Sequence, residues 1–262
     1  MLGDISRLDL RLRRQSSIAY AVGVTAYALL IVVLYPTFRV DTSLNKLTEG
    51  DSSLSALFGA TGSLTSPDGW MNANLYANFL PLFVLFMTIG YGASAVAGQN
   101  EDGTLGDVAV LPRTRAAVLL EKVATLSLLS LPVPLLCLVA SLAGHHWQVD
   151  LAVGALIGTT IGVALLGVNL GLVALAWGSW TGRRGGALGV ATGLAAVSYI
   201  VSSLAPVVSW IHPLRFYSLF YWAVGDDQLV NGLSAPGVAV LLSSAVALGA
   251  VAWRGFQQLD IR

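Results

Sequence analysis

Long apolar runs alternate with shorter polar segments along the whole chain. A helix that crosses the roughly 30 Å hydrocarbon core of a bilayer needs about 20 apolar residues, and each run is close to that length. Strands of a membrane barrel would be about ten residues long and would alternate apolar with polar positions, which these runs do not. The pattern predicts an all-α integral membrane fold with six transmembrane helices in a single domain, residues 1–262. The predicted spans are Ser17–Tyr35, Asn74–Ala97, Ala116–Ala143, Leu151–Trp177, Ala187–Pro206 and Pro236–Trp253.

Three segments outside the spans have a pattern of their own. Residues 1–15 are amphipathic and mix Asp with Arg, which predicts an N-terminal helix along the membrane interface. Residues 36–73 form a long external loop, in which the leucine spacing over 44–58 predicts a broken helix pair. This pair either covers the outer ends of the bundle or acts as a lid over an exit path. Residues 207–235 are too polar to span, and they predict short external or re-entrant helices between spans five and six.

Prolines and glycines inside the spans predict how the helices pack. Pro132 and Pro134 predict a kink in span three. Small residues at about every fourth position let backbones approach closely in lipid, either within one bundle or between subunits. These residues are Gly154, Gly158, Gly162, Gly167 and Gly171 in span four, and Gly185, Gly189 and Gly193 in span five.

Basic residues are distributed unequally between the two ends of the predicted spans. Of the 14 Lys and Arg residues, all except Arg39, Lys46 and Arg215 fall at one end. Loops rich in Lys and Arg face the cytoplasm, so we expect both termini and residues 99–115 to be cytoplasmic. The composition agrees with a membrane location: 11% of the residues are charged, against about 25% in an ordinary soluble domain.

Several kinds of chemistry are missing from the sequence. A phosphate-binding P-loop needs a Lys followed by Ser or Thr, whereas Lys46 and Lys122 each precede an aliphatic residue. Proton-driven transporters carry ionisable groups at mid-depth, but the spans have theirs only near the ends. The lone Cys137 and three external histidines make a poor metal site. We therefore expect a chain that is not an enzyme by itself, with no bound cofactor or metal and no nucleic-acid partner.

The stretch Gly98–Arg115, GQNEDGTLGDVAVLPRTR, interrupts the apolar pattern between spans two and three. Thr104 and Asp107 have the spacing of a capping box, and Pro112 disfavours helix at the preceding residue. We predict a short helix of about seven residues within 102–110, about 10 Å long, with charged residues before and after it. Such an element suits docking into a groove of a soluble partner, and it is equally compatible with an ordinary solvated hairpin.

The longer segment GQNEDGTLGDVAVLPRTRAAVLLEK resembles the ABC-2 type permease family: a glycine, acidic residues, Gly-Thr-Leu, a short apolar run, a Pro with nearby Arg, and then Lys. SALFGATGSLTSPDGWMNANLY is similar to the first external loop of one bacterial branch of that family. IHPLRFYSLFYWAVGDDQLVNG resembles the segment before its last helix. The resemblance covers most of the chain and agrees with it in order, spacing and number of helices.

This resemblance implies one half of a dimeric exporter in the bacterial cytoplasmic membrane. The second half is an identical or homologous permease, and two separate ABC ATPase subunits bind ATP and Mg. The acidic Gly-Thr-Leu position, which lies at the ATPase contact in the family, is occupied by Glu101, Asp102, Gly103, Thr104 and Leu105. The predicted coupling set also includes the neighbouring Asp107, Arg113 and Arg115. The chain departs from the family at Gln99 and Asn100, where relatives usually carry glutamates.

The substrate is the least specified part of the prediction. A passage without charges favours a hydrophobic or amphipathic molecule such as a drug, an antibiotic or a lipid. The residues predicted to line it are Phe79, Phe83, Phe86, Met87 and Asn169, which are also compatible with contact to lipid. Two other functions stay open: an ATP-driven permease for a small ion or a glycan, and a channel or scaffold that works without an ATPase.

The unequal distribution of basic residues gives a testable topology. In a Cys137→Ser background, a single cysteine at Gly186 is expected to react with a membrane-impermeant thiol reagent only after the membrane is opened. A cysteine placed in the 36–73 loop should react in intact cells. Labelling of the Gly186 position from outside would contradict the predicted orientation.

Overall fold

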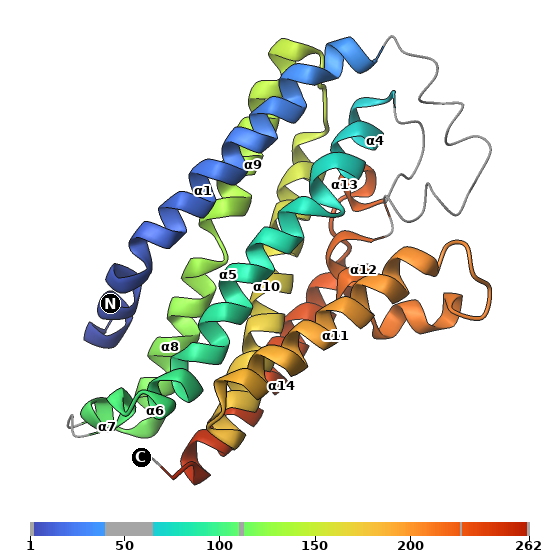
Figure 1. The fold of residues 1–262 in the computed structure, drawn as a ribbon. Helices are drawn as coiled ribbons and strands as arrows, with labels where there is room; N and C mark the ends of the chain where they lie inside the picture. Colours follow the sequence, from blue (N-terminus) through green and yellow to red (C-terminus); the bar gives the residue numbers. More distant parts are fainter. Residues whose placement is uncertain (1–2, 40–64, 110–112, 226, 261–262) are drawn as a thin grey trace.

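Helix α10, Val153–Thr181, is the central element of the computed structural model, and the other long helices surround it (Figure 1). The structure describes residues 3–39, 65–109, 113–225 and 227–260, and all regular elements within those ranges are helical. Six helical stretches are long and apolar enough to cross a membrane, which confirms the predicted multi-pass architecture. They are Ile5–Phe38, Pro67–Glu101, Arg115–Trp147, Val153–Thr181, Arg184–Leu204 and Ala235–Gln258.

The first span differs from its prediction, because α1 runs without interruption from Asp4 to Phe38. Its 35 residues rise about 52 Å at 1.5 Å per residue, well beyond the roughly 30 Å of a hydrocarbon core. The segment 1–15, predicted to lie along the interface, is in its described part continuous with the first span. Residues Ile5, Ser6 and Asp9 on this extension are buried against the bundle.

The second span begins earlier than predicted, so the loop predicted to reach residue 73 ends before it. Ser66 is the N-cap of α4 (Pro67–Met71), where its Oγ accepts a hydrogen bond from the Gly69 N–H at 3.2 Å. The chain stays helical through most of the stretch that follows, with two π-helical turns. The elements are η1 (Asn72–Tyr76), α5 (Phe79–Ala93), η2 (Ser94–Gly98) and α6 (Gln99–Glu101). The helix pair predicted over 44–58 lies outside the described residues.

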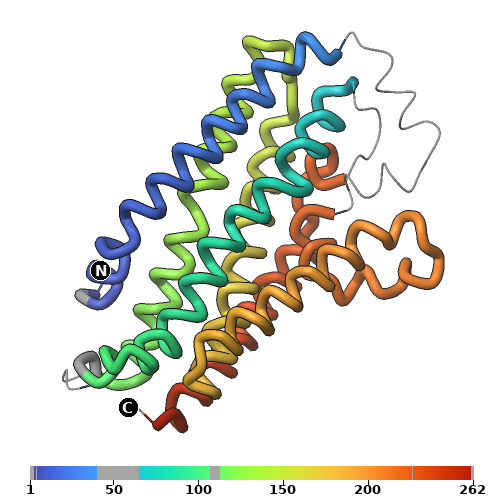
Figure 2. The backbone as a smooth tube through the Cα atoms, viewed as in Figure 1, coloured from blue at the N-terminus to red at the C-terminus, as the bar shows by residue number. Residues whose placement is uncertain are grey.

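The third span is broken where the prolines predicted a kink (Figure 2). Helix α8 (Arg115–Leu129) stops before Ser130, and α9 starts at Pro132 and ends at Ala143. Proline lacks a backbone N–H and cannot continue the hydrogen-bond ladder. The Ser130 hydroxyl donates instead to the Ser127 carbonyl at 2.8 Å, which satisfies one group at the break. A short 3-10 turn, η3 (Gly144–Trp147), ends the span.

The fifth and sixth spans are α11 (Arg184–Leu204) and α14 (Ala235–Gln258). Between them lie three short helices, as predicted for residues 207–235: η4 (His212–Tyr217), α12 (Leu219–Val224) and α13 (Gln228–Asn231). The side chains of η4 are not buried. In contrast, Phe220, Ala223 and Leu229 of the following helices are buried, because α12 and α13 pack on α10.

The glycines of α10 provide its closest contacts. A β-carbon at Gly92 of α5 would lie 2.1 Å from the Gly171 carbonyl oxygen, and one at Gly162 would lie 2.2 Å from that of Ala223. The backbones approach closely because these positions have no side chain. In α11, by contrast, β-carbons at Gly185, Gly189 and Gly193 of the small-residue stripe would meet no atom of the described residues within 4 Å. From Gly158 to Gly171 the α10 stripe therefore packs inside the bundle, whereas Gly154 and the α11 stripe face outward.

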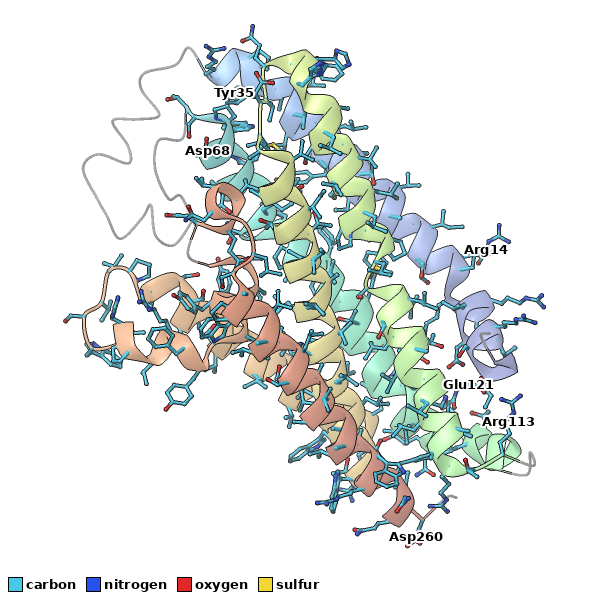
Figure 3. All side chains as sticks on the ribbon, turned by 180° about the vertical axis from the view of Figure 1, so that it is seen from behind. Arg14, Tyr35, Asp68, Arg113, Glu121 and Asp260 are labelled. Atoms are coloured by element: carbon cyan, nitrogen blue, oxygen red, sulfur yellow. The ribbon has the colours of Figure 1, made fainter. Side chains whose placement is uncertain are left out.

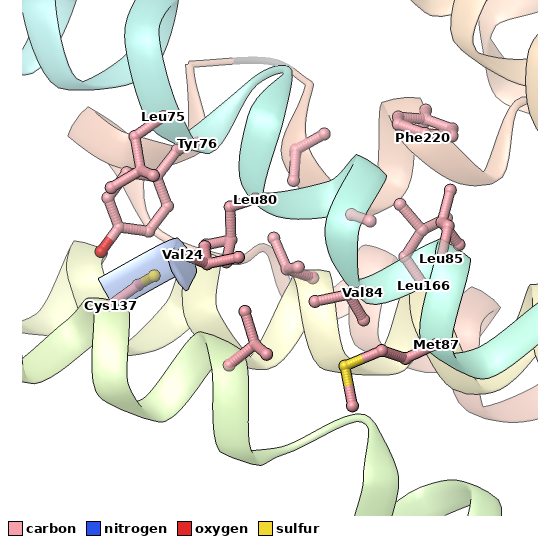
Figure 4. Close-up of a cluster of buried hydrophobic side chains, with 14 of the residues drawn as sticks. Val24, Leu75, Tyr76, Leu80, Val84, Leu85, Met87, Cys137, Leu166 and Phe220 are labelled. Carbon is pink, nitrogen blue, oxygen red and sulfur yellow. The ribbon is translucent and has the colours of Figure 1, made fainter. Parts of the chain in front are cut away.

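Two clusters of buried apolar side chains fill the bundle. Figure 4 shows part of the larger one, where side chains of α5 such as Leu80 and Val84 lie beside Val24 of α1 and Leu166 of α10. The smaller cluster includes Ile5, Leu105, Val118 and Phe256, at the end of the bundle that carries both termini (Figure 1).

The two ends of the bundle carry different side chains. Figure 3 places Arg14, Arg113, Glu121 and Asp260 toward one end. Tyr35 and Asp68 lie toward the other end in the same view. The N-terminus, the C-terminus and the α6–α7 segment share the first of these ends (Figure 1), which we call the basic end.

The contact between α5 and α10 predicts different outcomes at two neighbouring glycines. Gly92→Ala places a β-carbon against backbone and should lower the free energy of unfolding by about 1–3 kcal/mol. Gly90→Ala meets nothing within 4 Å and should be neutral, or stabilising by up to about 1 kcal/mol through helix propensity. Thermal unfolding of the two variants in detergent tests this contact, and equal melting temperatures would argue against it.

Candidate functional site

The polar stretch between spans two and three folds as a helical hairpin at the basic end. Helix α6 (Gln99–Glu101) ends in a turn at Gly103, which has φ +75°, and α7 follows over Thr104–Ala109. Glycine adopts this left-handed conformation without steric cost. The predicted short helix over 102–110 is thus present with narrower bounds. Its last predicted residue and Pro112 lie outside the described residues, as does the side chain of Asp107.

The predicted capping role of Thr104 differs from the structure. Thr104 is the first helical residue, and its hydroxyl donates to the Gln99 carbonyl at 3.4 Å, across the turn. The side chain therefore closes the hairpin onto α6. This position follows from Gly103, whose turn brings the two short helices together, and the sequence spacing of a capping box did not contain that information.

Two buried side chains fasten the hairpin to the bundle. Leu105 is 1% exposed and packs in the smaller apolar cluster. Asn100 is also buried, and its Nδ2 lies 3.0 Å from where a β-carbon at Gly182 would stand. Gly182 itself has φ +65° and ends α10. The hairpin is thus held against the end of α10 and cannot swing freely into solvent.

The two predicted acidic coupling residues have different surroundings. Glu101 Oε1 accepts a hydrogen bond of 2.9 Å from the Arg184 N–H, the first residue of α11. A carboxylate is stabilised there because the first N–H groups of a helix are unpaired and carry partial positive charge. Asp102 is exposed, and in the described part of the chain its carboxylate makes no hydrogen bond or ion pair. Of these two acidic residues, Asp102 is therefore the one whose carboxylate can accept hydrogen bonds from a partner.

The basic residues after the hairpin make contacts inside the chain. Arg113 forms an ion pair with Glu121. The second oxygen of Glu121 accepts hydrogen bonds from the N–H groups of Ile5 and Ser6, at 3.1 and 3.2 Å. Glu121 thus joins α8 to the first turn of α1, where its charge is again favourable.

Arg115 joins α8 to the C-terminal helix, as Glu121 joins it to the N-terminal one. Its Nη1 lies 2.9–3.1 Å from three backbone carbonyl oxygens at the end of α14, those of Phe256, Gln257 and Leu259. The last carbonyls of a helix have no intrahelical partner, and a cation satisfies both their hydrogen bonding and their partial charge. Arg115 was predicted as a coupling residue, and its side chain is placed to hold α8 against α14.

A buried ion pair lies directly beneath the hairpin. Lys122 is completely buried, and its Nζ lies 3.6 Å from Asp9 Oδ2 and donates to Gln99 Oε1 at 2.8 Å. Tyr91 donates to the same Asp9 oxygen at 2.7 Å. Because a buried charge is tolerated only when it is paired and hydrogen-bonded, these groups fix α1, α5, α6 and α8 relative to one another.

Sequence reasoning missed this pair. Asp9 was assigned to an interfacial helix, and Lys122 was counted only as a basic residue near a span end. One signal was present: Lys122 is the one lysine inside a predicted span, and such a charge is expected to have a partner. The identity of the partner depends on the continuous α1, which sequence spacing did not predict.

The predicted substrate-passage residues have different surroundings, although Phe86 and Met87 line the same small pocket between α1, α5 and α8. Asn169 is fully buried between α10 and α14, where its Nδ2 donates to the Leu241 carbonyl at 3.0 Å and its Oδ1 accepts from the Ser244 hydroxyl at 2.7 Å. Its amide is thus used in helix packing. Phe79 and Phe86 are 41% and 58% exposed on the bundle surface. Phe83 packs on the larger apolar cluster, and Met87 belongs to it (Figure 4).

A wide apolar groove of about 680 Å³ lies between spans three, four and six, beside the α8–α9 break. It is lined mainly by aliphatic residues, together with Ser127, Ser130 and Trp253, and none of the predicted passage residues contributes to it. For metals, the described residues contain no group of three or more His, Cys, Asp or Glu side chains that could hold an ion.

Comparison with known proteins leaves the family open. A scan against protein-family models found no match, and a search of the curated proteins found none either. The chain is thus established as a helical protein with six candidate membrane-spanning helices, and its assignment to a family belongs to the proposal below.

The buried pair predicts strong coupling between two substitutions. Lys122→Met should cost about 3–5 kcal/mol, because it removes the nearest cation from the buried Asp9 carboxylate. The double variant Asp9→Asn/Lys122→Met should recover most of that loss, since neither charge remains. Arg14→Met removes an exposed charge of α1, the helix of Asp9, and should change the free energy of unfolding by less than about 0.5 kcal/mol. Unfolding in detergent measures all three, and additive losses in the double variant would contradict the pairing.

Proposed function

We propose that this chain is the transmembrane permease subunit of an ABC-2 type ATP-binding cassette exporter. In this proposal it pairs with a second permease half, identical or homologous, and two separate ABC ATPase subunits bind and hydrolyse ATP with Mg. The chain lies in the bacterial cytoplasmic membrane with both termini in the cytoplasm. The observation that carries the proposal is the α6–α7 hairpin, an exposed acidic element fastened to the basic end of the bundle.

The exposed surface of the hairpin supports a role in docking. Glu101, Asp102, Gly103 and Thr104 are all exposed, while Leu105 and Asn100 hold the other face. One face of the hairpin is anchored and the other is polar. A displacement imposed on the polar face would therefore also move the helices to which the hairpin is anchored. These are also the residues that occupy the acidic Gly-Thr-Leu position of the family resemblance.

The contacts beneath the hairpin supply a route from that surface to the spans. Gln99 bonds to Lys122, which pairs with Asp9 of α1. Glu101 bonds to the first turn of α11. Arg115, where the chain leaves the hairpin, holds the end of α14. We infer that a displacement of the hairpin by ATP-driven closure of the partner would reach α1, α8, α11 and α14 together.

The carboxylate proposed to face the partner is that of Asp102. Glu101 is already engaged with α11, so its loss would alter the bundle as well as any partner contact. Asp102 is exposed and available, and a basic or amide group of the ATPase is its proposed partner. A rim ion pair of this kind contributes only about 0–1 kcal/mol, so the helix and its anchoring matter more than one charge.

A hydrophobic or amphipathic substrate is the class this proposal favours, because the outer faces of the spans and the groove beside the α8–α9 break are apolar. In this proposal Asn169 and the exposed phenylalanines do not line the substrate passage. Asn169 is occupied by packing, and the exposed phenylalanines face away from the bundle interior.

Breaking α7 tests the proposal. Proline in a helix interior costs about 3 kcal/mol. Val108→Pro should therefore abolish both the stimulated ATPase activity of the assembled complex and its transport activity. Val108→Ala, the matched control at the same position, should keep both. Asp102→Asn should reduce stimulated hydrolysis only partly. The measurement is ATP hydrolysis by the tagged chain, purified from its host together with its copurifying P-loop subunits and reconstituted in vesicles.

Two further readings complete the test. Purified alone, the chain should hydrolyse no ATP above background. The Val108→Pro variant should insert into the membrane and be purified in the same yield as the unmodified protein. This comparison distinguishes a loss of coupling from a loss of folding. Normal stimulated hydrolysis in a well-expressed Val108→Pro complex would make the hairpin a solvated connection. Absence of any P-loop subunit would favour the channel or scaffold function instead.

A further inference from the structure

A small polar pocket lies at the basic end between α1, α5 and α8. It measures about 210 Å³ and is lined on α1 by Arg13, Ser16, Ser17 and Tyr20. This volume is below the roughly 300–1,000 Å³ of sites for drug-sized molecules. The α1 side supplies a guanidinium and three hydroxyl groups, a set of donors that suits a phosphate group.

We propose that this pocket binds the phosphate headgroup of an anionic phospholipid from the leaflet at the basic end. The inference does not depend on transport, because it concerns a resident lipid. It holds whether or not the chain is a permease.

The depth of Arg13 fits a lipid headgroup. Residues 15–38 of α1 contain no charged side chain, and they rise about 36 Å at 1.5 Å per residue. A hydrocarbon core is roughly 30 Å thick, so Arg13 lies where the uncharged stretch ends, at headgroup level. Tyr20 is two turns further in, and tyrosine is typical of the boundary between headgroup and hydrocarbon.

The charge count at the pocket leaves a positive excess. Arg13 and Lys122 both interact electrostatically with Asp9. The other carboxylate that acts on Lys122, that of Glu121, is paired with Arg113. Lys122 is the closer of the two, with Asp9 Oδ2 at 3.6 Å and Gln99 Oε1 at 2.8 Å. Arg184 adds a further positive charge near Arg13, so a phosphate charge at Arg13 would reduce the excess.

Arg13 has N–H donors available for that charge. A guanidinium has five N–H donors, and within the described residues that of Arg13 donates to Ser94 Oγ and lies over the Tyr91 ring, 5.1 Å from its centroid. These two contacts fix the plane of the guanidinium, so its remaining donors are held in place beside the pocket hydroxyls.

The other wall of the pocket is apolar and opens to the lipid. Phe86 is 58% exposed on the bundle surface, and Met87 beside it is nearly buried. An acyl chain that leaves a phosphate at Arg13 would run along this wall. A free phosphate ion would gain nothing from Phe86, which is why we assign the site to a lipid.

The test is native mass spectrometry of the full chain in detergent, titrated with dioleoyl phosphatidylglycerol. The unmodified protein should bind one phosphatidylglycerol more tightly than phosphatidylcholine, and millimolar inorganic phosphate should not displace it. Arg13→Gln should weaken this binding about tenfold, the usual effect of losing a charged hydrogen bond. Arg14→Gln, which removes the neighbouring exposed charge, should change it less than about twofold.

A second pair of variants leaves every charge in place. Ser16→Trp fills the pocket and should abolish tight binding, while Val22→Trp on the exposed face of the same helix should not.

Arg13→Lys should restore part of the affinity lost in Arg13→Gln. Equal weakening by Arg13→Gln and Arg14→Gln, or displacement of the lipid by inorganic phosphate, would overturn the proposal. Tight binding that survives in a folded Ser16→Trp variant would overturn it as well.

Discussion

The charge of Lys122 has no contact with water, and this constraint organises the basic end of the protein. An ammonium group in a low-dielectric interior must be neutralised and hydrogen-bonded, and the groups that do so come from two other helices, α1 and α6. Asp9 supplies the charge, and Gln99 supplies an acceptor. The long extension of α1 and the position of the hairpin both follow from this requirement, because neither Asp9 nor Gln99 could reach Lys122 otherwise.

The same end of the bundle also satisfies its helix termini with side chains. Glu121 binds the first N–H groups of α1, Glu101 that of α11, and Arg115 the last carbonyls of α14. Each charge has the sign that the helix dipole favours. The charged residues around the hairpin therefore divide into those that hold helix ends together and those, such as Asp102, that remain available at the surface. A functional role for this segment rests on the second group, and the first gives it stiffness.

In the membrane-spanning part, close packing depends on the absence of side chains. The glycines of α10 let α5 and α12 approach its backbone, and the Asn169 amide bonds α10 to α14. Apolar side chains gain little from contact with one another in lipid, so small residues and buried hydrogen bonds determine which helices associate. The glycine stripe of α11 lacks such a neighbour within the described residues, which leaves that face to lipid or to another subunit.

The sequence alone determined the membrane class, the six spans, the break at Pro132 and the short helix of the polar stretch, because these depend on local apolar length and on backbone chemistry. It did not determine where α1 begins or what its acidic residue does, since amphipathic residues suit both an interface and a buried contact. Only the tertiary structure decided that Asp9 meets Lys122, that Arg115 caps a helix 141 residues away, and that Asn169 is used in packing. Such pairings join segments far apart in the chain, and no local pattern encodes them.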